Sequence, residues 1–292
     1  VVQENLTNSE VYELAVRYAP IGVALVALDG RWLQVNRALC DLLGRGESEM
    51  LASSFQQITH PEDLDSDLEL LLETLAGVRS GYRMEKRYLK PDGSTIWAQL
   101  DVVLVRRDNE PLYFISQLQD LGPRKEAEAQ LRQLALHDPL TDLPNRILMR
   151  DRLEQALHRS LRSERAPALG FIDLDDFKNI NDTRGHQFGD RLLVEVGRRL
   201  SVHLRPEDTL ARFGGDEFVI LLDEVADERD AAAIASRLLA CLRDPIVLGD
   251  EEHLVSASVG LVVALPESTA EDLLRHADLA MYAAKQSGKN RL

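Results

Sequence analysis

A Gly-Gly pair between two apolar segments is the feature that most constrains this chain. Residues 210–213 and 218–222 both have the composition of buried strands, and the glycines at 214–215 between them predict a tight hairpin. The tip of this hairpin carries Asp216 and Glu217 beside each other. Glycines let a ligand approach the backbone closely, and adjacent carboxylates suit Mg²⁺ better than Zn²⁺. The segment therefore predicts a site for phosphate chemistry.

Length and charge limit the classes of protein to which the chain can belong. Its 292 residues are enough for two domains, each with its own hydrophobic core. The formal net charge of -15 argues against a protein that binds nucleic-acid duplexes regardless of sequence, because that affinity comes from Lys and Arg neutralising phosphates. We expect no nucleic acid as a partner, whereas a small nucleotide held by a few local cations is compatible with this charge.

Cysteines and apolar runs bear on the compartment. Cys40 and Cys241 lie in separate halves of the chain within apolar patterns, which favours two small buried side chains over a disulfide framework. The sequence lacks an apolar run of about 18 residues and starts without the basic-then-apolar pattern of a signal peptide. We expect a cytoplasmic protein with no membrane segment in this sequence; membrane attachment through a segment outside it stays open.

The first part of the chain alternates short strand patterns with short helix patterns. The expected elements are strands near 23–28 and 31–35, a helix over 37–43, and an antiparallel meander over 82–89, 96–105 and 112–118. Turn sequences at 91–94 and 108–111 separate the strands of the meander. This order predicts an antiparallel sheet with helices on one face.

Four motifs in this part resemble those of PAS sensor domains. They are VNRALCDLLG, HPED, the PDGS turn and the tail QLQDLGPRK. We therefore assign residues 9–122 to a PAS domain. Its ligand is unknown, because Cys40 lacks the context of a flavin adduct and His60, which precedes a proline, is typical of the start of a helix rather than of a haem ligand. Trp32 and Trp97 are expected in the core.

Residues 123–137 read as a helical signalling linker. Ala127, Leu131 and Leu134 recur at spacings of four and three, which gives one apolar seam. Two alternatives are open: pairing with a second copy as a short parallel coiled coil, or packing on the chain's own domain. The residues at 122–123 are Gly and Pro, and we expect them to interrupt helix propagation locally.

From residue 138 on, the patterns read helix, strand, helix, strand, strand, helix, strand, helix, which predicts a mixed α/β (α+β) fold with antiparallel pairing. The clearest elements are a helix over 146–162, a strand over 168–173, a helical stripe of Leu192, Leu193, Val196 and Leu200, a strand over 255–265 and a helix over 270–285.

The segments FIDLDDFKNINDTRGHQFGD at 171–190 and RFGGDEF at 212–218 resemble the motifs of GGDEF domains, which are diguanylate cyclases. We assign residues 138–292 to such a domain and expect that its last strand is missing. The resemblance implies a palm-like nucleotidyl-cyclase fold, in which helices flank a mainly antiparallel central sheet.

A third carboxylate is expected at the hairpin. Asp173 ends an apolar strand, where it can join Asp216 and Glu217 around a hard cation. The resemblance implies one or two Mg²⁺ (or Mn²⁺) held by these carboxylates and by the carbonyl oxygen of Leu174. It also implies that Asp216, Glu217 and Lys178 are catalytic. Which of Asp216 and Glu217 accepts the proton stays open.

The same resemblance implies a set of residues that bind GTP. Lys178 lies near a predicted helix start, where backbone amides favour anions. An amide and a carboxylate, Asn181 and Asp190, suit the edge of guanine. For His186, a structural hydrogen bond and a ligand contact are equally open. The other expected substrate residues are Gly214, Gly215, Lys285, Lys289 and Phe177, of which Phe177 is expected mainly in the core.

Two further sets of polar residues complete the predicted site. Asp175, Asp176 and Asp182 are expected to cap or solvate helix starts rather than to bind metal. Arg205 and Asp208 lie just before the hairpin, where GGDEF domains have their product-inhibition site. The alternative for this pair is a surface ion pair of little energetic value. Arg237 is expected as a further contact from a neighbouring subunit.

Together these residues predict a homodimeric enzyme that converts two GTP into cyclic di-GMP and two pyrophosphates, adjusted by the PAS domain and by its product. The alternative is a catalytically silent module that binds GTP or cyclic di-GMP and controls a phosphodiesterase domain outside this sequence. A generic nucleotide cyclase or polymerase palm is disfavoured by the guanine-site pattern.

Overall fold

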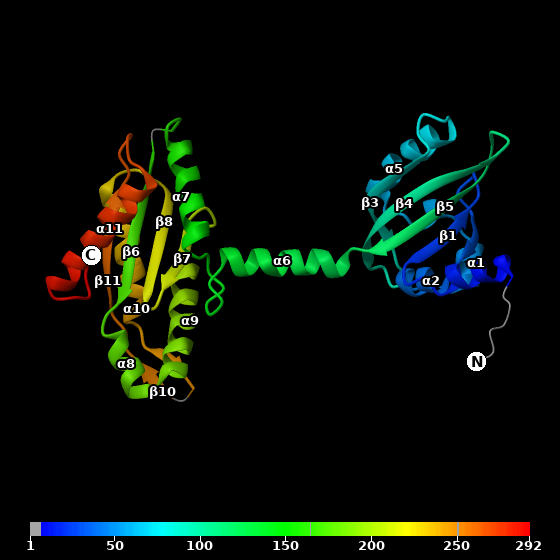
Figure 1. Cartoon of the computed structure of the whole chain (residues 1–292). Coiled ribbons are helices and arrows are strands. Elements are labelled where there is room, and N and C mark those ends of the chain that lie inside the picture. Colours follow the sequence, from blue (N-terminus) through cyan, green and yellow to red (C-terminus); the bar gives the residue numbers. More distant parts are fainter. Residues whose placement is uncertain (1–6, 164, 250) are drawn as a thin grey trace. The chain divides into compact units, whose positions relative to one another are not determined.

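The computed structural model describes residues 7–163, 165–249 and 251–292. The chain divides into two compact units, Val1–Ala129 and Gln130–Leu292. The division falls inside the helix α6, Gly122–Leu136, which is labelled in Figure 1. We call them the N-terminal and C-terminal units.

The N-terminal unit is built on a five-stranded antiparallel sheet in the order β2-β1-β5-β4-β3. Its strands are β1 (Gly22–Val26), β2 (Trp32–Val35), β3 (Gly81–Leu89), β4 (Thr95–Arg107) and β5 (Glu110–Asp120). Consecutive strands β3, β4 and β5 pair with one another, so the predicted meander is confirmed.

Helices cover this sheet and enclose its core. They are α1 (Asn8–Arg17), α2 (Arg37–Leu43), α3 (Glu47–Leu51), α4 (Phe55–Ile58) and α5 (Pro61–Leu75). Leu39 and Leu43 of α2 and Met50 of α3 pack with Phe114 and Leu118 of β5. A mixed α/β arrangement with an antiparallel sheet is therefore confirmed for this half of the chain.

Two single-residue predictions for this unit have different outcomes. His60 begins α5 as expected, since its Nδ1 accepts a hydrogen bond from the Glu62 N–H at 3.3 Å. Trp32 is buried in the core, but the expectation for Trp97 is wrong. Trp97 is half-buried on β4, with the Lys125 ammonium group 4.3 Å from its ring centroid. The first turn of α6 covers this ring with a cation rather than with apolar side chains.

An ion pair lies in the core of the N-terminal unit. The ammonium group of Lys86 contacts the Asp67 carboxylate, and the two side chains are 0% and 1% exposed. Lys86 Nζ also donates to Thr59 Oγ1 (2.9 Å), and the Tyr82 hydroxyl donates to Asp67 Oδ1 (2.7 Å). Beside the pair is a cavity of about 20 Å³, enough for about one water molecule.

Helix α6 begins at the residues that were expected to interrupt it. The Lys125 N–H donates to Leu121 O (2.9 Å), and Asp120 Oδ1 accepts from the Gly122 N–H (2.7 Å). Pro123 thus lies in the first helical turn, where its missing N–H has no intrahelical partner to lose. The predicted interruption is wrong. Leu131 and Leu134 are 66% and 67% exposed, so packing of the seam on the chain's own units is not observed.

The C-terminal unit is built on a four-stranded antiparallel sheet in the order β11-β6-β8-β7. Its strands are β6 (Ala166–Leu174), β7 (Thr209–Gly214), β8 (Glu217–Val225) and β11 (Ala257–Val263), and a separate hairpin of β9 (Ile246–Leu248) and β10 (Glu251–His253) was not predicted. The antiparallel sheet confirms the predicted fold class.

Helices lie on both faces of this sheet (Figure 1). They are α7 (Arg146–Ser160), α8 (Phe177–Arg184), α9 (His186–Val202), α10 (Glu228–Arg243) and α11 (Ala270–Gln286). Successive residues of β6 point to opposite faces. Ala168 and Ile172 pack with α9 and α10, whereas Leu169 and Phe171 pack with α7 and α11. Because both faces are covered, β6 is buried along nearly all of its length.

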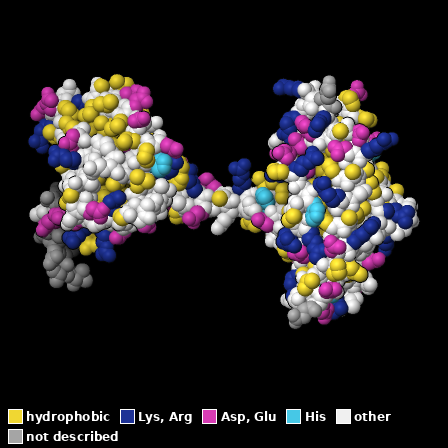
Figure 2. Space-filling model, turned by 180° about the vertical axis from the view of Figure 1, so that it is seen from behind, with side chains coloured by type: hydrophobic (Ala, Val, Ile, Leu, Met, Phe, Trp, Pro, Cys, Tyr) yellow, Lys and Arg dark blue, Asp and Glu magenta, His cyan; other side chains and the backbone are white. Residues whose placement is uncertain are grey.

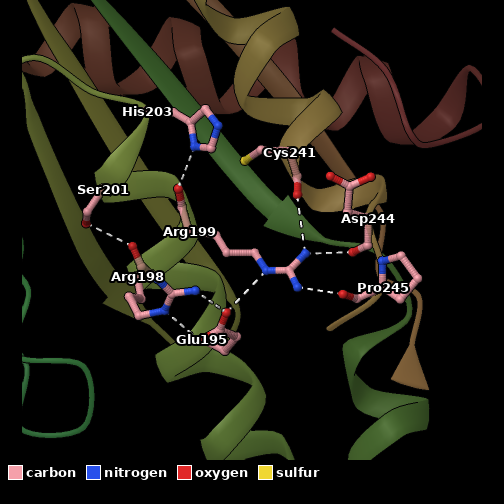
Figure 3. Close-up of polar contacts among 9 residues, drawn as sticks. Glu195, Arg198, Arg199, Ser201, His203, Cys241, Asp244 and Pro245 are labelled. Carbon is pink, nitrogen blue, oxygen red and sulfur yellow. Dashed lines mark hydrogen bonds and ion pairs between the residues drawn. The ribbon is translucent and has the colours of Figure 1, made fainter. Parts of the chain in front are cut away.

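Helix α9 is fixed against the end of α10 by Arg199 (Figure 3). Its guanidinium group donates to the carbonyl oxygens of Cys241, Asp244 and Pro245 at 3.5, 2.7 and 2.5 Å, and its Nε donates to Glu195 at 3.2 Å. These bonds satisfy carbonyl groups at a helix end that have no partner within the helix. Arg199 therefore has a structural role.

Figure 2 shows Lys and Arg side chains interspersed with Asp and Glu over both units, so on that face the negative charge is not gathered into one patch. We find no helix in residues 7–163, 165–249 and 251–292 with the length and apolar character that a bilayer crossing requires.

Candidate functional site

The Gly-Gly hairpin forms as the sequence predicts. Strands β7 and β8 pair up to Gly214 opposite Glu217, which leaves Gly215 and Asp216 at the tip. Gly214 and Gly215 have φ angles of 151° and 51°, in the region that side chains disfavour. Arg212 Nη2 and Nε donate to Gly215 O at 2.7 and 3.1 Å and hold the tip. The glycines are therefore required by the backbone geometry.

The carboxyl-terminal end of β6 lies beside this tip. Asp173 is the register partner of Glu217, and the Leu174 N–H donates to the Asp216 carbonyl oxygen at 3.3 Å. Burial raises the pKa of Asp173, Lys285 offsets part of the effect, and the Asp216 charge adds to it. Burial also raises the pKa of Glu217, together with the charges of Asp173 and Asp216. The three carboxylates are close enough to repel one another.

A metal ion would relieve this repulsion, but the described residues hold no ready-made cage for one. Within them, no three His, Cys, Asp or Glu side chains are arranged to ligate an ion by themselves. Asp173 Oδ1 is buried, and Lys285 Nζ contacts it at 2.6 Å as an ion pair. Because Mg²⁺ usually takes one or two carboxylates plus substrate phosphates, these residues fit an ion that binds together with a nucleotide.

The predicted phosphate-binding lysines come from three segments. Lys178 is exposed in the first turn of α8, where backbone amides also favour anions. Lys285, near the end of α11, lies on Asp173. Lys289 contacts Asp176 through its Nζ at 2.7 Å. Lys285 and Lys289 thus contact aspartates at or just after the carboxyl-terminal end of β6. Lys178 follows the same strand in the sequence.

The predicted base-binding residues meet where α8 faces the start of α9. Asn181 Oδ1 is buried and has no hydrogen-bond partner among the described residues. A Cβ atom at Gly189 would lie 1.9 Å from this oxygen and 3.1 Å from Phe177 Cζ, so a larger residue would displace the amide. Phe177 is buried in the core, as expected. His186 and Asp190 are exposed on the first turns of α9. A buried unpaired acceptor at this position suits a ligand with N–H donors.

Asp175, Asp176 and Asp182 were expected to cap or solvate helix starts, and this expectation is wrong for Asp175. Asp176 stands at the N-cap position of α8 with a φ of 57°, but its side chain accepts no capping hydrogen bond and faces Lys289 instead. Asp175 is buried and accepts from the hydroxyls of Ser256 and Ser258 and from the Asn290 N–H. Asp182 is exposed on α8. The alternating serines before and within β11 were the signal in the sequence for a buried polar contact.

The predicted inhibitory residues form one corner of the C-terminal unit. Asp208 accepts from the backbone N–H groups of Arg205 (3.1 Å) and Asp223 (3.3 Å), so it shapes the turn before β7. Within the described chain, the Arg205 guanidinium group forms no ion pair, which is not what the surface-pair alternative expects. Arg237 Nη2 donates to His203 O at 2.9 Å.

A pocket of about 450 Å³ adjoins this corner, between α9 and α10. Its lining includes Arg199, His203, Arg237, Cys241 and Asp244, and Figure 3 shows how Arg199 holds one wall. Cys241 is half-buried, and burial raises the pKa of its thiol. Cys40 is also free and half-buried.

The fold and this end of the sheet define a nucleotide-cyclase type of domain, and comparison with known families specifies it. Residues 135–291 match the family described as diguanylate cyclase, GGDEF domain, and residues 10–121 match the PAS fold. The chain belongs to the GGDEF family of diguanylate cyclases and carries a PAS domain before the GGDEF domain.

Individual relatives agree with this assignment. The bifunctional diguanylate cyclase/cyclic di-GMP phosphodiesterase MucR of Pseudomonas aeruginosa is 46% identical over 165 residues, which are 56% of this chain and 24% of that protein. The diguanylate cyclase TpbB of the same species is 42% identical over 168 residues, which are 56% of this chain and 38% of that protein. The chain thus spans well under half the length of these relatives.

Solved structures show the same fold for the C-terminal unit. The GGDEF domain of TpbB from P. aeruginosa matches with a TM-score of 0.51 and 40% identity, over 53% of this chain and 91% of that one. The GGDEF domain of DgcB from Caulobacter crescentus, solved in complex with c-di-GMP, matches with a TM-score of 0.51 and 28% identity, over 54% and 94%.

Proposed function

We propose that the C-terminal unit is an active diguanylate cyclase that condenses two GTP into cyclic di-GMP and two pyrophosphates. The observation that carries this proposal is twofold: Asp173 and Glu217 face each other beside the Asp216 tip, and Asn181 Oδ1 is buried without a hydrogen-bond partner among the described residues. The carboxylates favour a cation, and the Asn181 oxygen lies where a donor group can bind. A guanine nucleotide with its metal ion supplies both.

The carboxylates and the tip define the phosphate end of the site. Asp173, Asp216, Glu217 and the Leu174 carbonyl oxygen would hold Mg²⁺ or Mn²⁺, which when bound neutralises the triphosphate and polarises the α-phosphate. Gly214 and Gly215 leave room for phosphate oxygens at the backbone. Asp216 or Glu217 accepts the proton of the attacking 3′-hydroxyl group.

The lysines and the α8–α9 junction define the rest of the substrate. Lys178, Lys285 and Lys289 would contact phosphate oxygens, with Lys178 stabilising the charge that develops during transfer. Asn181 Oδ1 and the Asp190 carboxylate accept hydrogen bonds from N–H groups on the edge of guanine. His186 stands at the first turn of α9, within reach of this end of the site. This division between a phosphate end and a base end gives the site its preference for GTP.

Each domain holds one GTP, so closing the two phosphodiester bonds requires two copies of the chain. The exposed leucines of α6, Leu131 and Leu134, support association through this helix into a parallel pair. The PAS domain, joined directly to α6, would then adjust how often the two half-sites meet. Its ligand is not part of this proposal.

The test is Asp216→Asn, which keeps the size of the side chain and removes its charge. Incubated with GTP and Mg²⁺, this variant is expected to form cyclic di-GMP at least about a thousandfold more slowly than the parent. Asp182→Asn, an exposed change on α8, is the matched control and keeps full activity. Normal turnover by Asp216→Asn, or a parent protein that binds GTP without forming product, contradicts the proposal.

Product inhibition is tested separately. Arg205 and Asp208, with Arg237 beside them, offer a guanidinium pair and a carboxylate to the phosphates and bases of cyclic di-GMP. Arg205→Ala is expected to raise the final product level and to weaken inhibition by added cyclic di-GMP at least tenfold. Arg198→Ala, which removes an exposed arginine paired with Glu195, is the control. Unchanged inhibition in Arg205→Ala removes this assignment.

A further inference from the structure

Asp175 is a buried carboxylate without a cation. It is 6% exposed, and within the described residues it forms no ion pair. Three neutral donors surround it: the hydroxyls of Ser256 and Ser258 at 2.8 Å each and the Asn290 N–H at 3.0 Å. Hydrogen bonds to an ionised acceptor are roughly twice as strong as neutral ones, so this arrangement holds its donors firmly.

The donors belong to separate segments of the C-terminal unit. Ser256 precedes β11 and Ser258 lies within it, whereas Asn290 follows α11. The backbone of Asp175 adds a further bond, from its N–H to Ser256 O at 2.8 Å. One residue thus joins the end of β6, the start of β11 and the segment 288–291.

Segment 288–291 contains Lys289 and follows Lys285, two residues of the proposed phosphate end of the site. Lys289 immediately precedes Asn290, and Lys285 lies in the last turn of α11. The Arg291 carbonyl oxygen accepts from the Val259 N–H of β11 at 2.9 Å, so segment 288–291 runs along this strand. Gly288, Lys289 and Asn290 have φ angles of 116°, 58° and 50°, a succession that costs free energy unless contacts hold it.

We propose that Asp175 is a positioning residue, which holds segment 288–291 against β6 and β11 so that Lys289 and Lys285 are fixed beside the substrate phosphates. It acts through these residues and does not touch GTP. The inference rests on the proposed function and deepens it, because it explains how a lysine far along the chain is placed at the end of β6. It also accounts for the serines of the β11 segment.

The central variant is Asp175→Asn. An amide of the same shape keeps one acceptor but turns the other oxygen into a donor, which then faces a hydroxyl or the Asn290 N–H. We expect amide hydrogen exchange in the peptide covering residues 286–292 to accelerate at least tenfold. We also expect KM for GTP to rise about tenfold, with kcat changed less than threefold, because binding contacts are lost rather than the reacting groups. Asp182→Asn is the matched control for both measurements.

A second variant separates positioning from a general loss of structure. Removal of residues 288–292 takes away the segment that Asp175 is proposed to hold, and it is expected to raise KM about as much as Asp175→Asn does. If Asp175 acts through this segment, combining the two changes raises KM no further than either alone. A combined effect equal to the product of the separate effects overturns the proposal.

The remaining outcomes are also decisive. Unchanged exchange in Asp175→Asn shows that the carboxylate does not hold the segment, and faster exchange with unchanged KM shows that the segment does not serve the substrate; either result overturns the proposal. If the parent protein fails to form cyclic di-GMP, the proposed function fails and the substrate role of Asp175 falls with it. The exchange measurement, which needs no nucleotide, tells that failure apart from a failure of the contact itself.

Discussion

Asp67 in the N-terminal unit and Asp173 in the C-terminal unit are buried in opposite ways. Asp67 lies in the core against Lys86, and Thr59 and Tyr82 complete the hydrogen bonds of the pair. Asp173 ends a buried strand beside two further carboxylates, and its partner Lys285 is partly exposed. The first charge is enclosed and balanced, whereas the second lies in a cluster with more negative than positive charge.

This difference separates structure from function within one chain. A satisfied buried network limits the conformations that a core can adopt, and it offers nothing to a ligand. A cluster of like charges costs free energy in the unbound protein, and a cation that binds there relieves this cost. By this criterion the Lys86–Asp67 pair serves the structure of the PAS domain, and the end of β6 is where we expect a cation to bind.

The largest expected effect comes from breaking the satisfied network. Asp67→Leu leaves the Lys86 ammonium group buried without its partner, which should destabilise the N-terminal unit by about 3–5 kcal/mol. Both tryptophans of the chain, Trp32 and Trp97, lie in this unit, so urea unfolding followed by tryptophan fluorescence reports on it directly.

The matched control replaces both charges. Lys86→Met combined with Asp67→Leu removes the pair without leaving a buried charge, and it should recover most of the lost free energy of unfolding. Arg37→Ala, which breaks an exposed pair with Asp41 in the same unit, should cost less than about 0.5 kcal/mol. A loss below about 1 kcal/mol in Asp67→Leu would show that Lys86 reaches water.

Local patterns in the sequence predicted the β7–β8 hairpin and the strand beside it well. The hairpin strands, the Gly-Gly turn and the strand that ends at Asp173 each follow from a short stretch of residues, and the structure contains all of them. Alternation and turn chemistry act over neighbouring residues, which is why a single sequence reveals them. The strands of the PAS meander were predictable for the same reason.

Contacts between distant residues were not predictable in this way. Lys86 lies in a strand of otherwise ordinary polarity, and its partner is 19 residues away on a helix. Asp175 was expected at a helix start, but its donors come from more than 80 residues further on. Pro123 was expected to interrupt α6 because the sequence does not reveal that the helix begins one residue before it. Tertiary partners decided each case.

Asp138 is a carboxylate of the C-terminal unit that is paired with a cation. Arg212 donates to both oxygens of Asp138 at 2.8 and 3.0 Å, and it also holds Gly215. Burial alone would raise the pKa of Asp138, but the hydrogen bonds from Arg212 and Thr141 outweigh it and lower the pKa. Asp138→Asn should destabilise this unit by about 1.5–3 kcal/mol, the usual value for hydrogen bonds to a charged group.

The control for this prediction is the pH dependence of the stability loss in Asp138→Asn. Because the pKa of Asp138 is lowered in the folded protein, its contribution to stability is complete above the unfolded value of about 4 and is lost as the pH falls through the folded value. Tryptophan fluorescence does not follow the unfolding of the C-terminal unit, because both tryptophans lie in the N-terminal unit. Circular dichroism measured during urea unfolding should show the stability difference between Asp138→Asn and the parent at pH 7 and its disappearance in acid. A difference that persists unchanged at low pH would mean that shape, not charge, explains the effect.

The smallest expected effect has the opposite sign. Asp173→Asn removes a carboxylate that is buried near two others, so without Mg²⁺ and nucleotide it should stabilise the C-terminal unit by about 0.5–2 kcal/mol while cyclic di-GMP formation is lost. The pKa of Asp173 is raised in the folded protein, so the folded state binds more protons than the unfolded one as the pH rises from about 4. The parent therefore loses stability over that range, and Asp173→Asn does not. The stability gain of Asp173→Asn over the parent should be absent below about pH 4 and grow toward neutral pH. It should shrink when Mg²⁺ and GTP are added, because these ligands stabilise the parent. A variant that is less stable than the parent at pH 7 would place Asp173 with Asp67 among the carboxylates that hold the fold together.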